Sequence, residues 1–260
     1  EVAVVRRRSG RLAILKFAGE ATSAKPGELL LSAPGMLAYA TQKDEKPRDE
    51  LLADLDGDGR AELIVAEPSA ARLVVHRADP DGLSCRGDSF PSFVGARQPR
   101  IVDLDRDGQL DLLVAAQDEG AIGVAHVEKS HLTFPAPLGY KGDQLLALDA
   151  GDVDRSGTPA VFAVIATGKG TAKTYKLVRV AGSEPLAFDL PKLPVDPNDL
   201  WLVDLNRDGL KDAMVFMPTE MPRILLASKS PVGTLEFTAL ETQDVPGLGI
   251  LKGIAKTALH

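Results

Sequence analysis

Short runs of apolar residues, separated by polar turns, recur along the chain. Residues 51–53, 63–66 and 73–76 form three such runs in quick succession, rich in Leu, Val and Ile. Runs of this length and composition, bounded by Gly, Asp and Pro, are typical of β-strands and are too short for ordinary helices. The pattern therefore predicts a chain of short strands.

The same order of runs returns in later segments. A fourth, more variable run follows the third in several of them. Four antiparallel strands in each repeat is the arrangement of one β-propeller blade. The predicted strands of the later repeats are 101–102, 112–115, 122–127 and 132–134; 145–147, 161–165, 175–180 and 186–188; and 200–203, 213–216, 224–227 and 235–239.

The two ends of the chain fit the same scheme. Residues 1–5 match residues 62–66, and residues 256–260 have the composition of a strand that leads into another loop. We therefore expect an all-β fold with about five blades, and treat residues 1–260 as a single β-propeller domain. Two arrangements agree with this pattern: a five-bladed ring closed by pairing of the last strand with the first blade, or part of a larger propeller.

Composition narrows the function classes. The 260 residues are 44% hydrophobic, enough for a substantial core, and the net charge of −7 argues against a nucleic-acid partner. Cys85 is the only cysteine, so an internal disulfide is excluded. The segment has no apolar stretch long enough for a membrane span, so we expect no membrane insertion.

An Asp-rich loop lies between the first and second predicted strands of each repeat. The loops begin at Asp54, Asp103, Asp152 and Asp204, a spacing of 49, 49 and 52 residues. A fixed period of this size is typical of repeat architectures. The four nine-residue loops, here called loops 1 to 4, read DLDGDGRAE, DLDRDGQLD, DVDRSGTPA and DLNRDGLKD.

Oxygen ligands in this spacing predict calcium sites. Calcium takes six to eight oxygens, which a tight loop supplies from side chains at positions 1, 3 and 5 and a carbonyl at position 7. An EF-hand is excluded, because position 12 is Val65, Val114 or Val215 instead of Glu and the flanks are strand-like. The expected ligands are Asp54, Asp56, Asp58, the Arg60 carbonyl and Glu62 in loop 1; Asp103, Asp105, Asp107, the Gln109 carbonyl and Asp111 in loop 2; and Asp204, Asn206, Asp208, the Leu210 carbonyl and Asp212 in loop 4.

Loop 3 departs from this pattern at two positions. Ser156 replaces a carboxylate at position 5, and Ala160 removes the one at position 9. We therefore expect three calcium ions, with a fourth, weaker site at Asp152, Asp154 and Ser156. The alternative for every loop is a turn held by hydrogen bonds from side chains to the backbone, without metal.

Residues 54–65, 103–114 and 204–215 look like FG-GAP, or VCBS-type, repeats. These calcium-loop blades occur in integrin α-subunit propellers and in many bacterial secreted proteins. The resemblance implies an extracellular, periplasmic or cell-surface location. It also implies a role in adhesion or protein interaction, in sugar binding as a lectin, or as a scaffold beside a separate catalytic domain.

No catalytic constellation stands out in the sequence. The four histidines, including His76 and His126 at equivalent third-strand positions, are far apart, and we expect these two to be half-exposed. The tripeptide at 86–88, Arg-Gly-Asp, matches an integrin-recognition sequence, but an ordinary polar turn is expected there. We therefore expect a non-catalytic scaffold or adhesion module with a protein partner. The alternative is a carbohydrate-binding lectin, or the propeller part of a polysaccharide-degrading enzyme, with a glycan partner.

Overall fold

The computed structural model describes residues 2–6, 11–15, 35–38, 49–79, 82–84, 86–128, 131–140, 144–182 and 186–240. These residues form antiparallel β-strands and three single turns of 3-10 helix, η1 (Pro68–Ala70), η2 (Gln117–Glu119) and η3 (Gly170–Ala172). None of these turns has the length needed to cross a bilayer.

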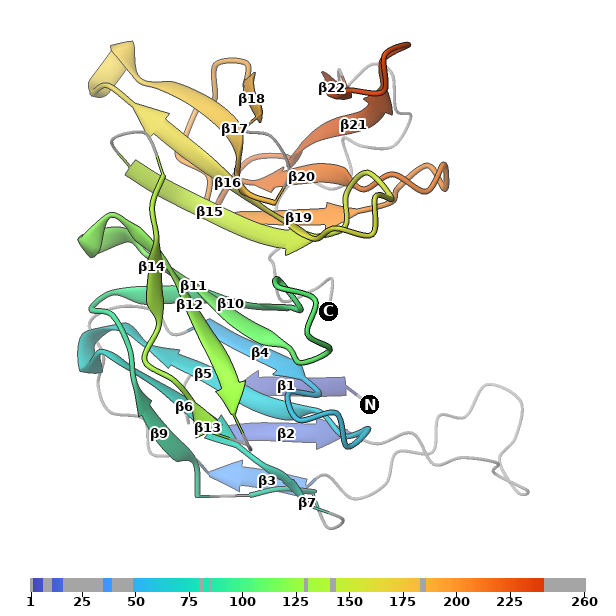
Figure 1. The fold of residues 1–260 in the computed structure, drawn as a ribbon. Helices are drawn as coiled ribbons and strands as arrows, with labels where there is room; N and C mark the ends of the chain where they lie inside the picture. The colour runs from blue at the N-terminus through green and yellow to red at the C-terminus, as the bar shows by residue number, and fades with distance from the viewer. Residues whose placement is uncertain are drawn as a thin grey trace, which may run out of the picture.

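The strands form successive sheets in chain order, which we call blades 1 to 5 (Figure 1). A separate small hairpin joins β7 (Ala78–Asp79) and β8 (Gly82–Leu83). Blade 1 is β1 (Val2–Arg6), β2 (Arg11–Leu15) and β3 (Gly35–Ala38); blade 2 is β4 (Asp49–Ala53), β5 (Glu62–Glu67), β6 (Arg72–His76) and β9 (Asp88–Pro91); blade 3 is β10 (Ala96–Val102), β11 (Asp111–Ala116), β12 (Ala121–Glu128), β13 (His131–Leu132) and β14 (Ala136–Leu138); blade 4 is β15 (Gln144–Gly151), β16 (Ala160–Thr167), β17 (Thr174–Ala181) and β18 (Leu186–Asp189); blade 5 is β19 (Asp199–Val203), β20 (Asp212–Phe216), β21 (Arg223–Lys229) and β22 (Leu235–Ala239).

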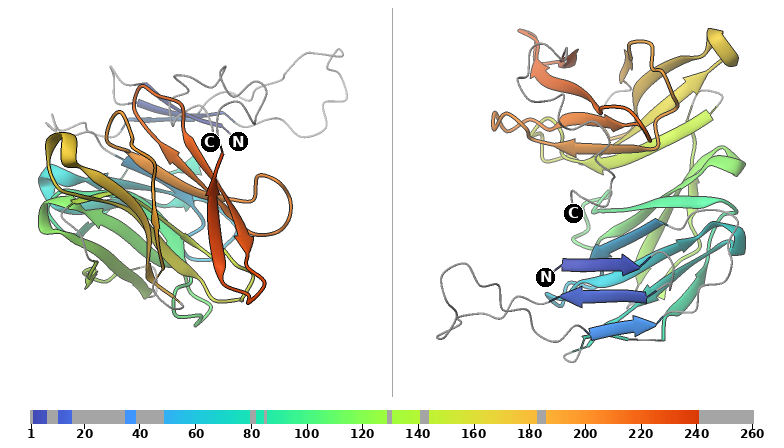
Figure 2. Two further views of the ribbon diagram at one scale, coloured as in Figure 1. Left: turned by 90° about the horizontal axis from the view of Figure 1, so that it is seen from above. Right: turned by 180° about the vertical axis from the view of Figure 1, so that it is seen from behind.

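This architecture confirms the all-β prediction, and the strand order is that of propeller blades. In blades 2 to 5 the first strands β4, β10, β15 and β19 lie toward the middle of the molecule, and the later strands lie outside them (Figures 1 and 2). Among the described strands, no pairing joins blade 5 to blade 1. The closed five-bladed ring and the part of a larger propeller therefore both stay predictions, and residues 256–260 lie outside the described part of the chain.

The second strand of each of these blades is buried on both faces, which explains its unbroken apolar sequence. In β11, Leu112 and Val114 pack with blade 2, whereas Leu113 and Ala115 pack with blade 4. Successive side chains of a strand point to opposite faces, so one short strand supplies two interfaces. The core therefore lies between the blades as well as within them.

Two local predictions are wrong. The fourth strand of blade 3, predicted at 132–134, is divided into β13 and β14, because Pro135 has no N–H to donate to a strand ladder. Phe134 between them is 56% exposed and packs edge-on against Phe93. His76 is not half-exposed but 4% exposed, since Gly87 packs against its ring. The His126 side chain is half-exposed (50%), as predicted.

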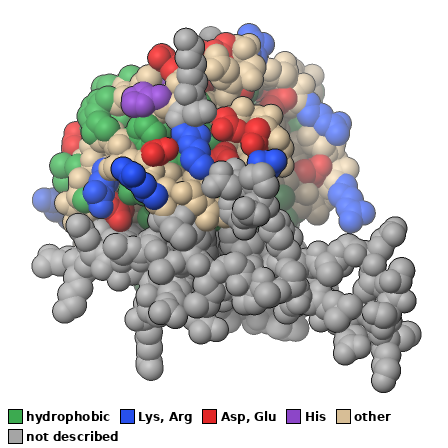
Figure 3. Space-filling model, turned by 90° about the horizontal axis from the view of Figure 1, so that it is seen from below, with side chains coloured by type: hydrophobic (Ala, Val, Ile, Leu, Met, Phe, Trp, Pro, Cys, Tyr) green, Lys and Arg blue, Asp and Glu red, His purple; other side chains and the backbone are tan. Residues whose placement is uncertain are grey.

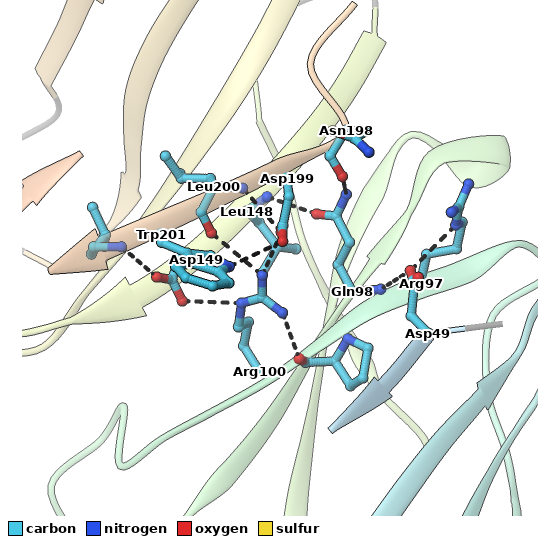
Figure 4. A network of polar contacts seen from close by, with 12 residues as sticks. Asp49, Arg97, Gln98, Arg100, Leu148, Asp149, Asn198, Asp199, Leu200 and Trp201 are labelled. Atoms are coloured by element: carbon cyan, nitrogen blue, oxygen red, sulfur yellow. Dashed lines mark hydrogen bonds and ion pairs between the residues drawn. The ribbon is translucent and has the colours of Figure 1, made fainter. Parts of the chain in front are cut away.

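Gln98 joins three blades at the centre of the molecule. It lies in a bulge of β10 with a left-handed backbone, φ 51°. Its side-chain Nε2 donates to the carbonyl of Leu146 (3.0 Å). The same Nε2 donates to the carbonyl of Asn198 (2.8 Å), and Oε1 accepts the N–H of Leu148 (3.0 Å) (Figure 4). One side chain thereby satisfies buried backbone groups in blade 4 and beside blade 5.

Arg100, two residues after Gln98 in β10, makes further contacts with blades 4 and 5. Its Nε lies 3.2 Å from Asp149 Oδ1 in β15, and its Nη2 lies 2.5 Å from Asp199 Oδ1 in β19 (Figure 4). Burial raises the pKa of Asp149, and the Arg100 charge opposes that shift. Asp199 is 0% exposed and also accepts the indole N–H of Trp201 (3.0 Å). We call Gln98, Arg100, Asp149 and Asp199 the axial network.

Candidate metal loops

All four loops fold around the carboxylate at position 1. Its Oδ2 accepts the N–H of the position-6 glycine in every case, at 2.8 to 3.1 Å. The side chain at position 5 accepts the N–H of position 7, including the Ser156 hydroxyl of loop 3 (3.2 Å). Ser156 thus keeps the turn that an aspartate makes in the other loops, but it supplies no negative charge.

Two positions of each loop have left-handed backbones. Position 6 is glycine in all four loops, with φ between 74° and 88°, as the sequence motif requires. Position 4 is Gly57 in loop 1, but Arg106, Arg155 and Arg207 in loops 2 to 4, with φ of 58° to 64°. A left-handed arginine costs roughly 1–2 kcal/mol. A left-handed position 4 was not predicted from the sequence, although Gly57 was a signal for it.

Loops 1 and 2 each bring three carboxylates together. Oxygens of Asp54, Asp56 and Asp58 lie within 4.8 Å of one another, as do those of Asp103, Asp105 and Asp107. In loop 2, Asp103 Oδ1 is buried and has no hydrogen-bond partner. Because like charges this close repel and an unpaired buried oxygen is costly, the arrangement fits a bound cation.

The carboxylates at position 9 are organised differently. Glu62, Asp111 and Asp212 are buried, and each accepts the N–H of the residue at position 2, at 2.8 to 3.0 Å. The second oxygen of Asp111 lies 2.6 Å from His126 Nδ1. These contacts close the base of the loop, a role that was not predicted from the sequence. Their assignment as metal ligands stays a prediction.

Loop 3 has cations beside its remaining carboxylates. Asp154 Oδ1 accepts the Ser156 N–H (3.1 Å), and Arg179 lies 4.0 Å from Asp154 Oδ2. Burial would raise the pKa of Asp154, but the Ser156 hydrogen bonds and the charges of Lys229 and Arg179 lower it overall. Protein groups thus already stabilise the charge on this carboxylate.

In loop 4, Asn206 and Asp208 form a reciprocal pair. The Asp208 N–H donates to Asn206 Oδ1 (3.0 Å), and Asn206 Nδ2 donates to Asp208 Oδ2 (2.9 Å). Hydrogen bonds from Leu210 and Asn206, and then the Arg155 charge, lower the pKa of Asp208. Positions 1, 3 and 5 therefore offer two carboxylates and one amide oxygen, all ligand types that calcium accepts.

The Arg-Gly-Asp tripeptide lies close to loop 1. Asp88 begins β9, and its Oδ2 lies 3.5 Å from Arg77 Nε. Arg77 also lies 3.5 Å from Asp56 Oδ2. The acidic residue of the tripeptide therefore belongs to a strand and has an ion-pair partner, and Cys85 lies outside the described residues.

Residues 54–114 match the family model of the FG-GAP-like repeat. This part of the chain is similar to an FG-GAP-like repeat. The matched residues run from the start of loop 1 through blade 2 to loop 2 and β11, so the FG-GAP resemblance seen in the sequence is confirmed. No curated protein matches the chain significantly.

Proposed function

We propose that this chain is a non-catalytic, calcium-stabilised propeller module of a secreted or surface protein, which serves as a scaffold for binding a protein partner. The observation that carries the calcium assignment is the buried, unpaired Asp103 Oδ1 beside Asp105 and Asp107. Loops 1, 2 and 4 would each hold one ion, and loop 3 would hold a weaker one. A bound calcium ion would balance the negative charge of these oxygens.

A structural role for the ions follows from the position of the loops. Each loop joins the first strand of a blade to its buried second strand, and the first strand lies in the middle of the molecule. A cation in the loop would hold the first and second strands of the blade in place. The outer strands would stay available for contact with a partner. The FG-GAP match supports an extracellular or surface setting for such a module.

Surface features favour a protein over a glycan as the partner. Trp201, the only tryptophan, packs on Phe216 at 4.8 Å between ring centroids and donates to Asp199, so it is engaged within blade 5. Its ring is therefore a poor platform for stacking on a sugar. Among the described residues on the face shown in Figure 3, acidic and basic side chains are mixed, without a single-sign patch for a polyanion.

Replacement of Asp105 by Ala tests the structural role of the metal. The change should remove one ion and about 2.7 kcal/mol of stabilisation at a calcium concentration a hundredfold above the dissociation constant. The melting temperature in calcium should fall by roughly 5–10 °C. Asp154→Ala is the matched control in loop 3, and should cost less because Ser156 and Ala160 already weaken that site.

Partner capture should follow folding in both variants. The intact chain, displayed on beads with calcium, should retain a protein from its native source and give no hit on a glycan array. Asp105→Ala that melts normally but loses partner or glycan binding would make the metal part of a working site and would contradict the scaffold assignment.

A further inference from the structure

Loops 3 and 4 are in direct contact, although they belong to different blades. The Lys211 N–H in loop 4 donates to the Val153 carbonyl in loop 3 at 2.9 Å. The Arg155 guanidinium of loop 3 lies against Gly209 of loop 4, where a Cβ atom would stand only 1.7 Å from Arg155 Cζ. The equivalent glycines of the other loops, Gly59, Gly108 and Gly157, have open space at this point.

This contact places the positive charge of Arg155 beside Gly209, the position-6 glycine of loop 4. The position-6 glycines of the other three loops have no such neighbour. Arg155 stands at position 4 of loop 3, the loop that has lost two carboxylates; its backbone is left-handed and the residue is exposed. The positive charge of Arg155 contributes to the lowered pKa of Asp208, a candidate ligand of loop 4. Arg106 occupies the same position in loop 2 with the same backbone, but no position-6 glycine lies against it.

We propose that Arg155 is a built-in cation that links loop 3 to loop 4 and weakens calcium binding at loop 4 relative to loops 1 and 2. The proposal rests on the proposed function, since it concerns the metal of the same loops. A guanidinium near a divalent ion repels it, whereas in the metal-free protein the same guanidinium offsets the negative charge of loop 4. Loop 4 thus differs in calcium affinity from loops 1 and 2, and Arg155 sets that difference.

Calcium titration of Arg155→Gln by calorimetry tests this proposal. Loop 4 is identified first as the binding component that Asp208→Asn removes. In Arg155→Gln that component should bind calcium about fivefold more tightly, the effect of removing one charge several ångströms from a divalent ion in water. Arg106→Gln, the matched control, should leave the loop 4 component unchanged. An unchanged loop 4 component in Arg155→Gln would overturn the proposal.

A melt in excess chelator separates this proposal from the calcium assignment. Without metal, Arg155→Gln should lower the melting temperature by about 2 °C, the size of a surface ion contact, whereas Arg106→Gln should not. If no variant bound calcium, the proposed function would fail, and a selective drop in this melt would still support the Arg155 link. Equal metal-free melts of the two variants would refute the link.

Discussion

Saturating calcium should raise the melting temperature of the chain by roughly 15–30 °C above its value in excess chelator. A ligand that binds the folded state alone stabilises it by mass action, about 2.7 kcal/mol per site at a hundredfold excess over the dissociation constant. Three sites at loops 1, 2 and 4 would together contribute about 8 kcal/mol. Calorimetric melts of one sample with calcium and with chelator measure the difference.

Magnesium at the same concentration is the control for this prediction. It is smaller than calcium, requires near-octahedral geometry and keeps several waters, so it should raise the melting temperature far less. The loops already carry hydrogen bonds from side chains to the backbone, such as Gly59 N–H to Asp54. Equal melts with calcium and with chelator would mean that these hydrogen bonds alone hold the turns.

Replacement of Arg100 by Ala should cost about 3–5 kcal/mol, with or without calcium. The change removes the Arg100 cation from the fully buried Asp199 and also removes the ion pair to Asp149. A buried charge that loses an ion-pair partner costs much more than a surface charge that does so, and Asp199 lies where blades 3, 4 and 5 meet. Chemical denaturation in chelator measures the loss without any contribution from metal.

Arg97→Ala is the matched control in the same strand. Arg97 lies 3.4 Å from Asp49 Oδ2, but 31% of its side chain is exposed, so its loss should cost less than about 1 kcal/mol. The two variants remove the same residue type three positions apart in β10. A similar cost for both would show that the axial network is not a major source of stability.

Features that repeat within the chain could be predicted from its sequence. The strands of blades 2 to 5 follow from apolar runs, and the turn at Gly59, Gly108 and Gly209 follows from a residue that tolerates a positive φ. The arginines at position 4, such as Arg106, gave no such signal, because arginine has no preference for a left-handed backbone. Only the folded loop shows that position 4 requires it.

The contacts between blades could not be predicted from the sequence pattern. Gln98 bonds to the Asn198 carbonyl across a separation of 100 residues, and its side chain reaches there from a β-bulge that no periodicity marks. The burial of Asp111 and its bond to Leu104 were hidden for a different reason. An acidic residue at position 9 looks the same in the sequence whether its carboxylate binds a metal or closes the base of its loop.

The most direct test of the account is the number of calcium ions that the metal-stripped chain binds. Isothermal titration should show three ions for the unaltered chain, with a weaker fourth at Asp152 and Asp154, and one tight ion fewer for Asp105→Ala. A total of one ion or none, in protein that is folded by circular dichroism, would contradict the assignment of loops 1, 2 and 4 as calcium sites.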